Sequence, residues 1–163
     1  MSTRTSWAAA PMRVGPSMAG PVVVGVDGGP RSIRALRWAA EEARLRGAVV
    51  IAVHACESPG PVAPYAPVHP QQPGWEQQLR DEENHLADLV RDALGVPGVV
   101  EVRQVCEPTS PVRALLAHAD GAALLVLATS ADTTGGTGIG ATALACVRHA
   151  PCPVVVLPSE GAA

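Results

Sequence analysis

Five short apolar runs alternate with amphipathic segments along the chain. Continuous runs of four to eight apolar residues are typical of strands that are buried on both faces. The run at 99–105 alternates apolar with polar residues instead, which favours a strand at the edge of a sheet. The predicted strands are Pro21–Val26, Ala48–His54, Val99–Val105, Leu124–Leu127 and Val154–Leu157.

The segments between these strands have the period of helices. Pro111 follows Ser110, an N-cap residue, and opens a helix that runs to His118, and a short helix precedes the last strand. Two longer helices are predicted at Ser32–Arg46, which ends at Gly47, and at Trp75–Leu94. Their expected core residues are Ile33, Leu36, Ala40, Ala43 and Leu45 in the first, and Trp75, Leu79, Leu86, Leu89, Val90 and Ala93 in the second.

Alternating strands and helices predict an α/β fold. We expect one domain with an open, mostly parallel, Rossmann-like sheet of five strands and helices on both faces. The domain is predicted to span 21–158, with a disordered N-terminal tail at 1–20 and a C-terminal tail at 159–163. Prolines in 57–74 exclude a helix or a central strand there and predict a surface loop.

Composition excludes several classes of function. The chain has 163 residues, a net charge of −3, and arginine for all twelve of its basic residues. Without lysine, there is no Walker-type lysine and no Schiff-base or pyridoxal-phosphate lysine. The arginines are dispersed, so we expect no nucleic-acid partner. The sequence contains no apolar run long enough for a membrane span or a signal peptide, so we expect a cytoplasmic protein without a membrane partner.

Other side chains that carry chemistry are not grouped into a motif. The four cysteines form no C-x-x-C and are interpreted as small buried apolar residues, and the histidines lack metal-ligand spacing, so no metal site is predicted. Ser130 lacks the flanking glycines of a nucleophile elbow. The G-x-G-x-G of 136–140 differs from a dinucleotide fingerprint and follows the fourth strand rather than the first. We therefore expect no catalytic residue.

The stretch from Leu124 to Leu157 contains the main candidate site. A strand leads into a loop rich in Thr and Gly at 129–140 and then into a helix. Such an arrangement presents backbone N–H groups and a helix N-terminus to an anion. Gly138, Gly140 and Thr142 are the candidates here, with Thr142 as a source of a hydroxyl.

The two ends of this pattern resemble the universal stress protein family. The resemblance rests on VVVGVDGGPRSIRALRWAAEEARLRGA followed by VVIAVHA near the N-terminus, and on RHAPCPVVVLP at 148–158. It implies the strand order 3-2-1-4-5 and a homodimer formed by antiparallel pairing of the fifth strands, here Val154–Leu157. It also implies a crevice between the first and fourth strands, rimmed by Asp27 and Ala128, where ligands of open α/β sheets bind.

Members of this family that bind ATP carry the pattern G-x-x-G, nine residues, then G followed by Ser or Thr. Gly140 matches the last glycine, but Ala128, Ala131 and Ala141 occupy the other three positions once a one-residue deletion is allowed. Asp27 matches the family aspartate at the nucleotide, and Val53 the residue whose backbone meets the adenine. Asp27 before two glycines is equally a turn former, and Val53 is equally a core residue.

Two functions fit these residues. The first is a non-catalytic regulatory or adaptor module of the stress response, with an eroded ATP-binding motif, a homodimeric state, no certain cofactor and an unidentified protein partner. The second is a nucleotide sensor or slow ATPase that binds ATP with Mg²⁺ through the loop at 129–140. An enzyme acting on metabolites is a third and weaker alternative, because the sequence shows no catalytic pair.

Overall fold

The computed structural model describes residues 20–56, 74–95, 100–129 and 139–158. The predicted tails at 1–20 and 159–163 and the predicted loop at 57–74 lie outside these ranges, apart from Gly20 and Gly74.

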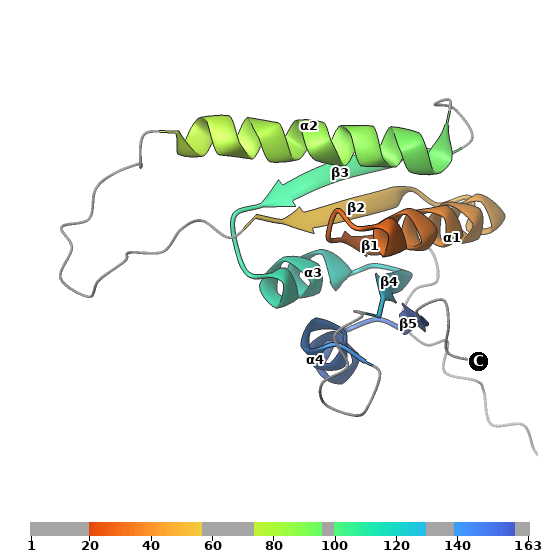
Figure 1. Cartoon of the computed structure of the whole chain (residues 1–163). Coiled ribbons are helices and arrows are strands. Elements are labelled where there is room, and N and C mark those ends of the chain that lie inside the picture. Colours follow the sequence, from red (N-terminus) through yellow and green to blue (C-terminus); the bar gives the residue numbers. More distant parts are fainter. Residues whose placement is uncertain (1–19, 57–73, 96–99, 130–138, 159–163) are drawn as a thin grey trace, which may run out of the picture.

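Five strands form one parallel sheet in the order β3-β2-β1-β4-β5 (Figure 1), which confirms the expected fold and strand order. The central strand β1 is buried along its length because its neighbours and the helices cover it on every side. The strands are β1 (Val22–Val26), β2 (Val50–Ala55), β3 (Val102–Glu107), β4 (Leu124–Ala128) and β5 (Val154–Leu157).

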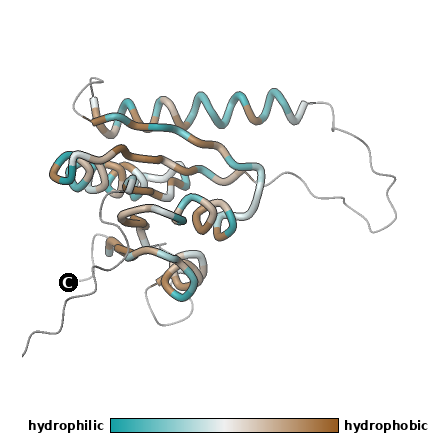
Figure 2. The backbone as a smooth tube through the Cα atoms, turned by 180° about the vertical axis from the view of Figure 1, so that it is seen from behind, coloured by the Kyte–Doolittle hydropathy of each residue, from teal (hydrophilic) through white to brown (hydrophobic). Residues whose placement is uncertain are grey.

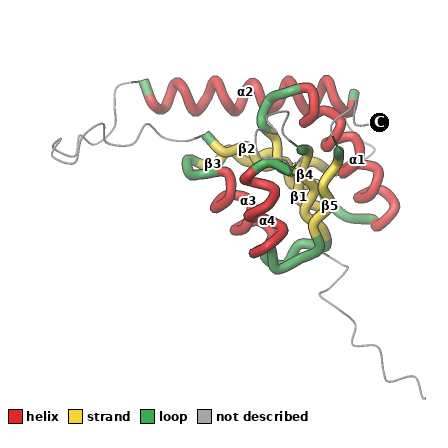
Figure 3. The backbone as a smooth tube through the Cα atoms, turned by 60° about the horizontal axis from the view of Figure 1, so that its bottom comes forward, coloured by secondary structure: helices red, strands yellow, loops and turns green. Residues whose placement is uncertain are grey.

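Four helices cover the two faces of this sheet. Two apolar clusters, one on each face, divide the helices into pairs: α1 and α2 pack on Val22, Val24 and Val26 of β1, whereas α3 and α4 pack on Val23. Figure 3 shows α3 and α4 side by side, away from α1. The helices are α1 (Pro30–Arg46), α2 (Trp75–Leu94), α3 (Pro111–Ala119) and α4 (Ala141–His149).

Element boundaries differ from the sequence-based expectations at a few points. β3 begins three residues later than expected, because its pairing with β2 starts at Val50↔Val102. Ser110 occupies the N-cap position of α3, but its side chain makes no capping hydrogen bond. The expectation that Leu45 faces the core is wrong, since this side chain is 66% exposed. Nine residues separate it from Leu36, which is about half a turn around a helix.

The helix α2 extends beyond the sheet. Its buried residues, Leu86, Leu89, Val90 and Ala93, all lie in its C-terminal half. Its N-terminal half reaches past the carboxyl ends of the strands (Figures 1 and 2), and hydrophilic residues dominate it in Figure 2. No described helix combines the length and apolar character that crossing a membrane requires.

Arginines of α1 bind backbone carbonyls of three other elements. Arg31 Nη1 donates to the Thr129 carbonyl just after β4 at 3.2 Å, Arg34 Nη1 to the Pro158 carbonyl just after β5 at 2.8 Å, and Arg37 Nε to the Ala93 carbonyl in α2 at 2.9 Å. These contacts join α1 to segments that are distant in the sequence.

Candidate functional site

A crevice opens where β1 and β4 separate. Their pairing ends at Val24↔Val126, although β1 continues beside β2 to Val26↔His54 and β4 beside β5 to Ala128↔Leu157. The strand order reverses at this point, since β2 lies on one side of β1 and β4 on the other. Crevices at such positions are the usual ligand sites of open α/β sheets.

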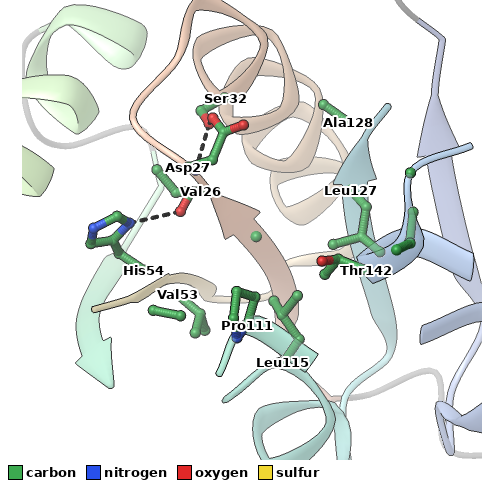
Figure 4. Close-up of a pocket in the computed structure, with 15 residues that line it drawn as sticks. Val26, Asp27, Ser32, Val53, His54, Pro111, Leu115, Leu127, Ala128 and Thr142 are labelled. Carbon is green, nitrogen blue, oxygen red and sulfur yellow. Dashed lines mark hydrogen bonds between the residues drawn. The ribbon is translucent and has the colours of Figure 1, made fainter. Parts of the chain in front are cut away.

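This crevice holds a cavity of about 330 Å³, a size at the small end of small-molecule sites. Apolar side chains of Val53, Leu115 and Leu127 form much of its wall, and polar groups of Asp27 and Thr142 stand at opposite sides (Figure 4). The cavity is therefore suited to a ligand with a flat apolar part and a polar or charged end.

Gly25 leaves this space open. A Cβ atom at Gly25 would lie 2.8 Å from Leu127 Cδ2 and 3.1 Å from Leu115 Cδ2. Both distances are shorter than ordinary van der Waals contact, so any larger residue here would fill the cavity and displace its walls.

Asp27 lies directly after β1 and organises the turn that leads into α1. Its Oδ1 accepts a hydrogen bond from the Ser32 hydroxyl at 2.5 Å, a pair of residues that Figure 4 shows, and another from the Gly29 N–H at 2.9 Å, while its own N–H donates to Ser32 Oγ at 2.8 Å. Gly28 within the turn has φ +82°, a conformation that side chains with a Cβ atom rarely adopt. The turn-forming interpretation of Asp27 thus matches the contacts that it makes.

The charge of Asp27 is well stabilised. Burial of the carboxyl raises its pKa, but the hydrogen bonds from Ser32, Gly29 and its own amide, with the charge of Arg31, outweigh this effect and leave the pKa below its ordinary value of 3.8. A carboxylate with a lowered pKa is a weak proton acceptor at neutral pH. It remains a good acceptor of hydrogen bonds from a ligand's hydroxyl groups.

The N-terminus of α4 faces the cavity across from Asp27. Its N-cap is Gly140, which has no side chain to make a capping hydrogen bond, and Gly140, Ala141, Thr142 and Ala143 all line the cavity. The first N–H groups of a helix lack partners within the helix and carry partial positive charge. This end of the cavity therefore suits a phosphate or another anion.

One buried hydroxyl near the crevice has no partner. Thr129 follows β4 and is 7% exposed, and among the described residues its Oγ1 makes no hydrogen bond. A buried unpaired hydroxyl is costly. The adjoining 130–138 lie outside the described residues, and with them Ala131, Gly138 and most of the predicted anion-binding loop.

The structure brings most of the sequence-predicted site residues together. Asp27, Val53, Ala128, Gly140 and Thr142 all line the same cavity, and Gly138 is not described. Gly25, Ser32, Leu115 and His54 also line it and were missed. The sequence could have indicated Ser32, because a hydroxyl in the first turn of a helix can reach back to an aspartate that precedes the helix.

Cysteines and metal-ligating residues do not form a second site in the described ranges. No three His, Cys, Asp or Glu side chains there are placed to hold a metal ion. Cys56, Cys146 and Cys152 are buried, and burial raises the pKa of each thiol; the pKa of the half-buried Cys106 rises to about 12. Neutral thiols of this kind are poor nucleophiles.

Comparison with known proteins identifies relatives over most of the chain. The model of the Universal stress protein family matches residues 18–158. Universal stress protein Rv2623 of Mycobacterium tuberculosis is 34% identical over 147 residues, which cover 85% of this chain and 48% of the relative. Universal stress protein Rv2005c of the same species is 30% identical over 146 residues, which cover 86% of this chain and 48% of the relative. The chain thus spans about half the length of the curated relatives it matches.

Solved structures share the fold. The universal stress protein UspA from Lactobacillus plantarum has a TM-score of 0.67 at 20% identity. The match covers 85% of this chain and 97% of the UspA chain. The universal stress protein from Archaeoglobus fulgidus in complex with dAMP has a TM-score of 0.59 at 24% identity. The match covers 86% of this chain and 98% of that chain. A universal stress protein solved in complex with cAMP also has a TM-score of 0.59 at 24% identity. The match covers 88% of this chain and 100% of that chain.

Proposed function

The chain belongs to the universal stress protein family, and on that premise we propose that it is a non-catalytic regulatory module that binds a nucleoside monophosphate in the crevice between β1 and β4. The observation that carries this proposal is the cavity itself. It places an apolar wall beside Val53, a charged acceptor at Asp27 and the open N-terminus of α4 around one space.

Each part of a nucleotide has a suitable surface in this cavity. The base would lie on the apolar wall against Val53, and the ribose hydroxyls would donate to Asp27. The phosphate would accept hydrogen bonds from the first N–H groups of α4 and from the Thr142 hydroxyl. Two structural neighbours, each 24% identical, are complexes with dAMP and cAMP, which supports a ligand with one phosphate.

A nucleotide with one phosphate fits the sequence better than ATP with Mg²⁺. The pattern of ATP-binding members requires glycine at the positions of Ala128 and Ala131 and a hydroxyl at the position of Ala141. The methyl group of Ala128 lines the cavity near the start of the loop. Each lost hydrogen bond to a charged phosphate would weaken binding by roughly 1.5–3 kcal/mol. One phosphate at α4 does not need these contacts.

The contacts of Asp27 and His54 support a non-catalytic role. Asp27 is hydrogen-bonded to Ser32 and Gly29, and its lowered pKa makes it a weak general base. The nitrogens of His54 contact Val26 and Glu82. We therefore expect no phosphate release from Mg-ATP above the blank rate in a sensitive phosphate assay. Release that disappears in Asp27→Ala would contradict this prediction.

Titration calorimetry with AMP, cAMP and Mg-ATP tests the proposed ligand. We expect binding of the monophosphates and weaker binding of Mg-ATP, with binding abolished in Gly25→Val, weakened in Asp27→Ala and Gly140→Val, and unchanged in Arg103→Gln at the distant β3. Failure of all three nucleotides to bind, or undiminished binding by Gly25→Val, overturns the assignment. Tight binding of Mg-ATP alone favours an ATP sensor.

The proposed regulatory module is a homodimer paired through β5. All four residues of β5, Val154–Leu157, are apolar and half-buried, and the strand pairs with β4 on one side. The opposite edge strand, β3, carries the exposed Arg103, which pairs with Glu101 at 2.9 Å. Charged side chains discourage pairing at an edge, whereas an uncharged apolar edge favours it. A protein partner would then bind a dimer.

A further inference from the structure

His54 stands between the crevice and the projecting half of α2. Its side chain is 13% exposed and lines the cavity next to Val53. Nδ1 lies 2.9 Å from the Val26 carbonyl oxygen at the end of β1, and Nε2 lies 3.1 Å from Glu82 Oε2 on α2 (Figure 4 shows the first contact). This one ring therefore joins two strands and a helix.

Both neighbours of the ring are hydrogen-bond acceptors. A carbonyl oxygen cannot donate, so Nδ1 must carry a hydrogen to bond Val26. An ionised carboxylate cannot donate either, so the contact with Glu82 requires a second hydrogen, on Nε2. The two hydrogen bonds together require one proton more than a neutral imidazole beside a carboxylate carries. Loss of that proton would leave the Nε2 lone pair facing Glu82 Oε2.

Acidic groups outnumber basic ones around His54, where the basic groups are His85 of the same hollow and Arg31 beside Asp27. An open hollow beside it is lined by Asp27 of the β1 turn and by Asp81, Glu82 and His85 of α2. Glu83 lies close enough to raise the pKa of both neighbouring thiols, Cys56 just after β2 and Cys106, the register partner of His54 on β3. These thiols stay neutral and the pKa of Asp27 is lowered, so negative charge predominates around the ring at neutral pH.

The projecting half of α2 is only partly covered. Within the described part of the chain, no residue from Trp75 to His85 is buried. His85 packs over the Asp27–Gly29 turn, where its Nε2 would lie 3.1 Å from a Cβ on Gly28. Because Glu82 lies within this half and His54 within the sheet, their hydrogen bond holds the helix beside the turn at Asp27 and against the ring that lines the cavity.

We propose that His54 and Glu82 form a proton-operated latch, which is closed when the pair shares a proton and released when the proton is lost. Histidine is the side chain that ordinarily changes charge between about pH 5 and 8. Closure fixes the end of β1 and the turn at Asp27. The latch also makes ligand binding in the crevice depend on pH. Only this part of the proposal rests on the proposed nucleotide function.

Hydrogen exchange of the full chain without nucleotide tests the latch. After correction for intrinsic exchange rates, we expect amides of 75–85 to be about five-fold or more better protected at about pH 6 than at about pH 8.5. Amides of 86–94 should not change. Equal protection of 75–85 at the two pH values overturns the latch.

Two matched variants separate the latch from a general charge effect. The amide of Glu82→Gln can donate to a neutral Nε2, so protection of 75–85 should become independent of pH. Glu83→Gln removes the same charge one residue further along and should keep the pH dependence of the wild type. If Glu83→Gln loses that dependence as Glu82→Gln does, the latch is overturned.

Cyclic AMP serves as the probe of coupling because its phosphodiester keeps one charge across this range. We expect wild-type affinity to be about five-fold higher at pH 6 than at pH 8.5, with proton uptake on binding, and Glu82→Gln to bind equally at both. Equal wild-type affinities overturn the coupling. An absence of cAMP binding at either pH counts against the nucleotide function, whereas the exchange experiment still decides the latch.

Discussion

Asp27 shows how one side chain determines the form of the site. It closes a small ring of hydrogen bonds with Ser32 and Gly29 at the end of β1. Sequence reasoning could predict a turn here, because aspartate before two glycines favours one. A hydroxyl in the first turn of the following helix also makes Ser32 a candidate partner of the carboxylate, although the direction in which α1 leaves the turn decides whether the two groups meet.

Replacement of Asp27 by asparagine should destabilise the protein in a pH-dependent way. Ser32 and Gly29 would lose a charged acceptor, which we expect to cost about 1 kcal/mol once the solvent exposure of Asp27 is allowed for. Because the folded-state pKa is lowered, this stabilisation is fully present above the ordinary pKa of 3.8 and is lost as pH falls through the lower folded value. Urea unfolding at neutral pH and at about pH 2 measures the difference. An equal difference at both pH values would contradict the prediction.

Gly25 is the residue on which the cavity depends. Valine there would press on Leu127 and Leu115, whose flexible side-chain ends lie 2.8 and 3.1 Å from the added Cβ. We expect Gly25→Val to lower the free energy of unfolding by about 1–3 kcal/mol and to fill the cavity. Thermal unfolding and a crystal structure of the variant check both effects. A cavity that persists would show that the walls give way instead.

The apolar spacing in the sequence predicts the bounds of some helices and strands better than those of others. The bounds of α2 follow from its apolar spacing, and Trp75–Leu94 is predicted and observed. Spacing alone could not show that only the C-terminal half is buried, because the length of the underlying strands decides that. For β3, the start follows the pairing with β2 rather than its own alternation.

The two halves of α2 should respond differently to the same substitution. Leu86 is 2% exposed in the core, whereas Leu79 is half-buried on the projecting half. We expect Leu86→Ala to cost about 2–5 kcal/mol of stability and Leu79→Ala less than about 1 kcal/mol. Denaturant unfolding of both variants tests this. Equal costs would mean that the projecting half packs as firmly as the rest.

At the scale of the whole molecule, topology assembles the site. Asp27, Val53 and Ala128 are far apart in the sequence but meet because the carboxyl ends of parallel strands share one edge. Periodicity predicts that such an edge exists, and the family resemblance supplied the strand order. The contact between His54 and Glu82 joins residues 28 positions apart, across a segment whose path the sequence does not determine.

The edge of β5 away from β4, which pairs with no other described strand, allows a dimer test with an internal control. The carbonyl of Pro153 accepts a hydrogen bond from Leu125 of β4, and that of Leu157 accepts one from Thr129 just after β4. Backbone groups alternate in direction along a parallel strand, so those of Val155 face β4 and those of Val156 face outward. We expect Val156→Pro to remain folded but monomeric in light scattering, and Val155→Pro to lose stability. A dimeric Val156→Pro protein would contradict pairing through β5.

The arginine contacts of α1 have a consequence for biosynthesis. The helix is made early, yet its acceptors on Thr129 and Pro158 lie 98 and 124 residues further on. The central strand β1 likewise waits for β4, since Val22 pairs with Leu124. At translation rates of about 5–20 residues per second, a gap of about 100 residues lasts about 5 to 20 seconds. For that time the nascent chain presents the central strand of the sheet, four of whose five residues are valine, with one flank open, and an unpaired apolar strand of this kind favours aggregation until β4 is made.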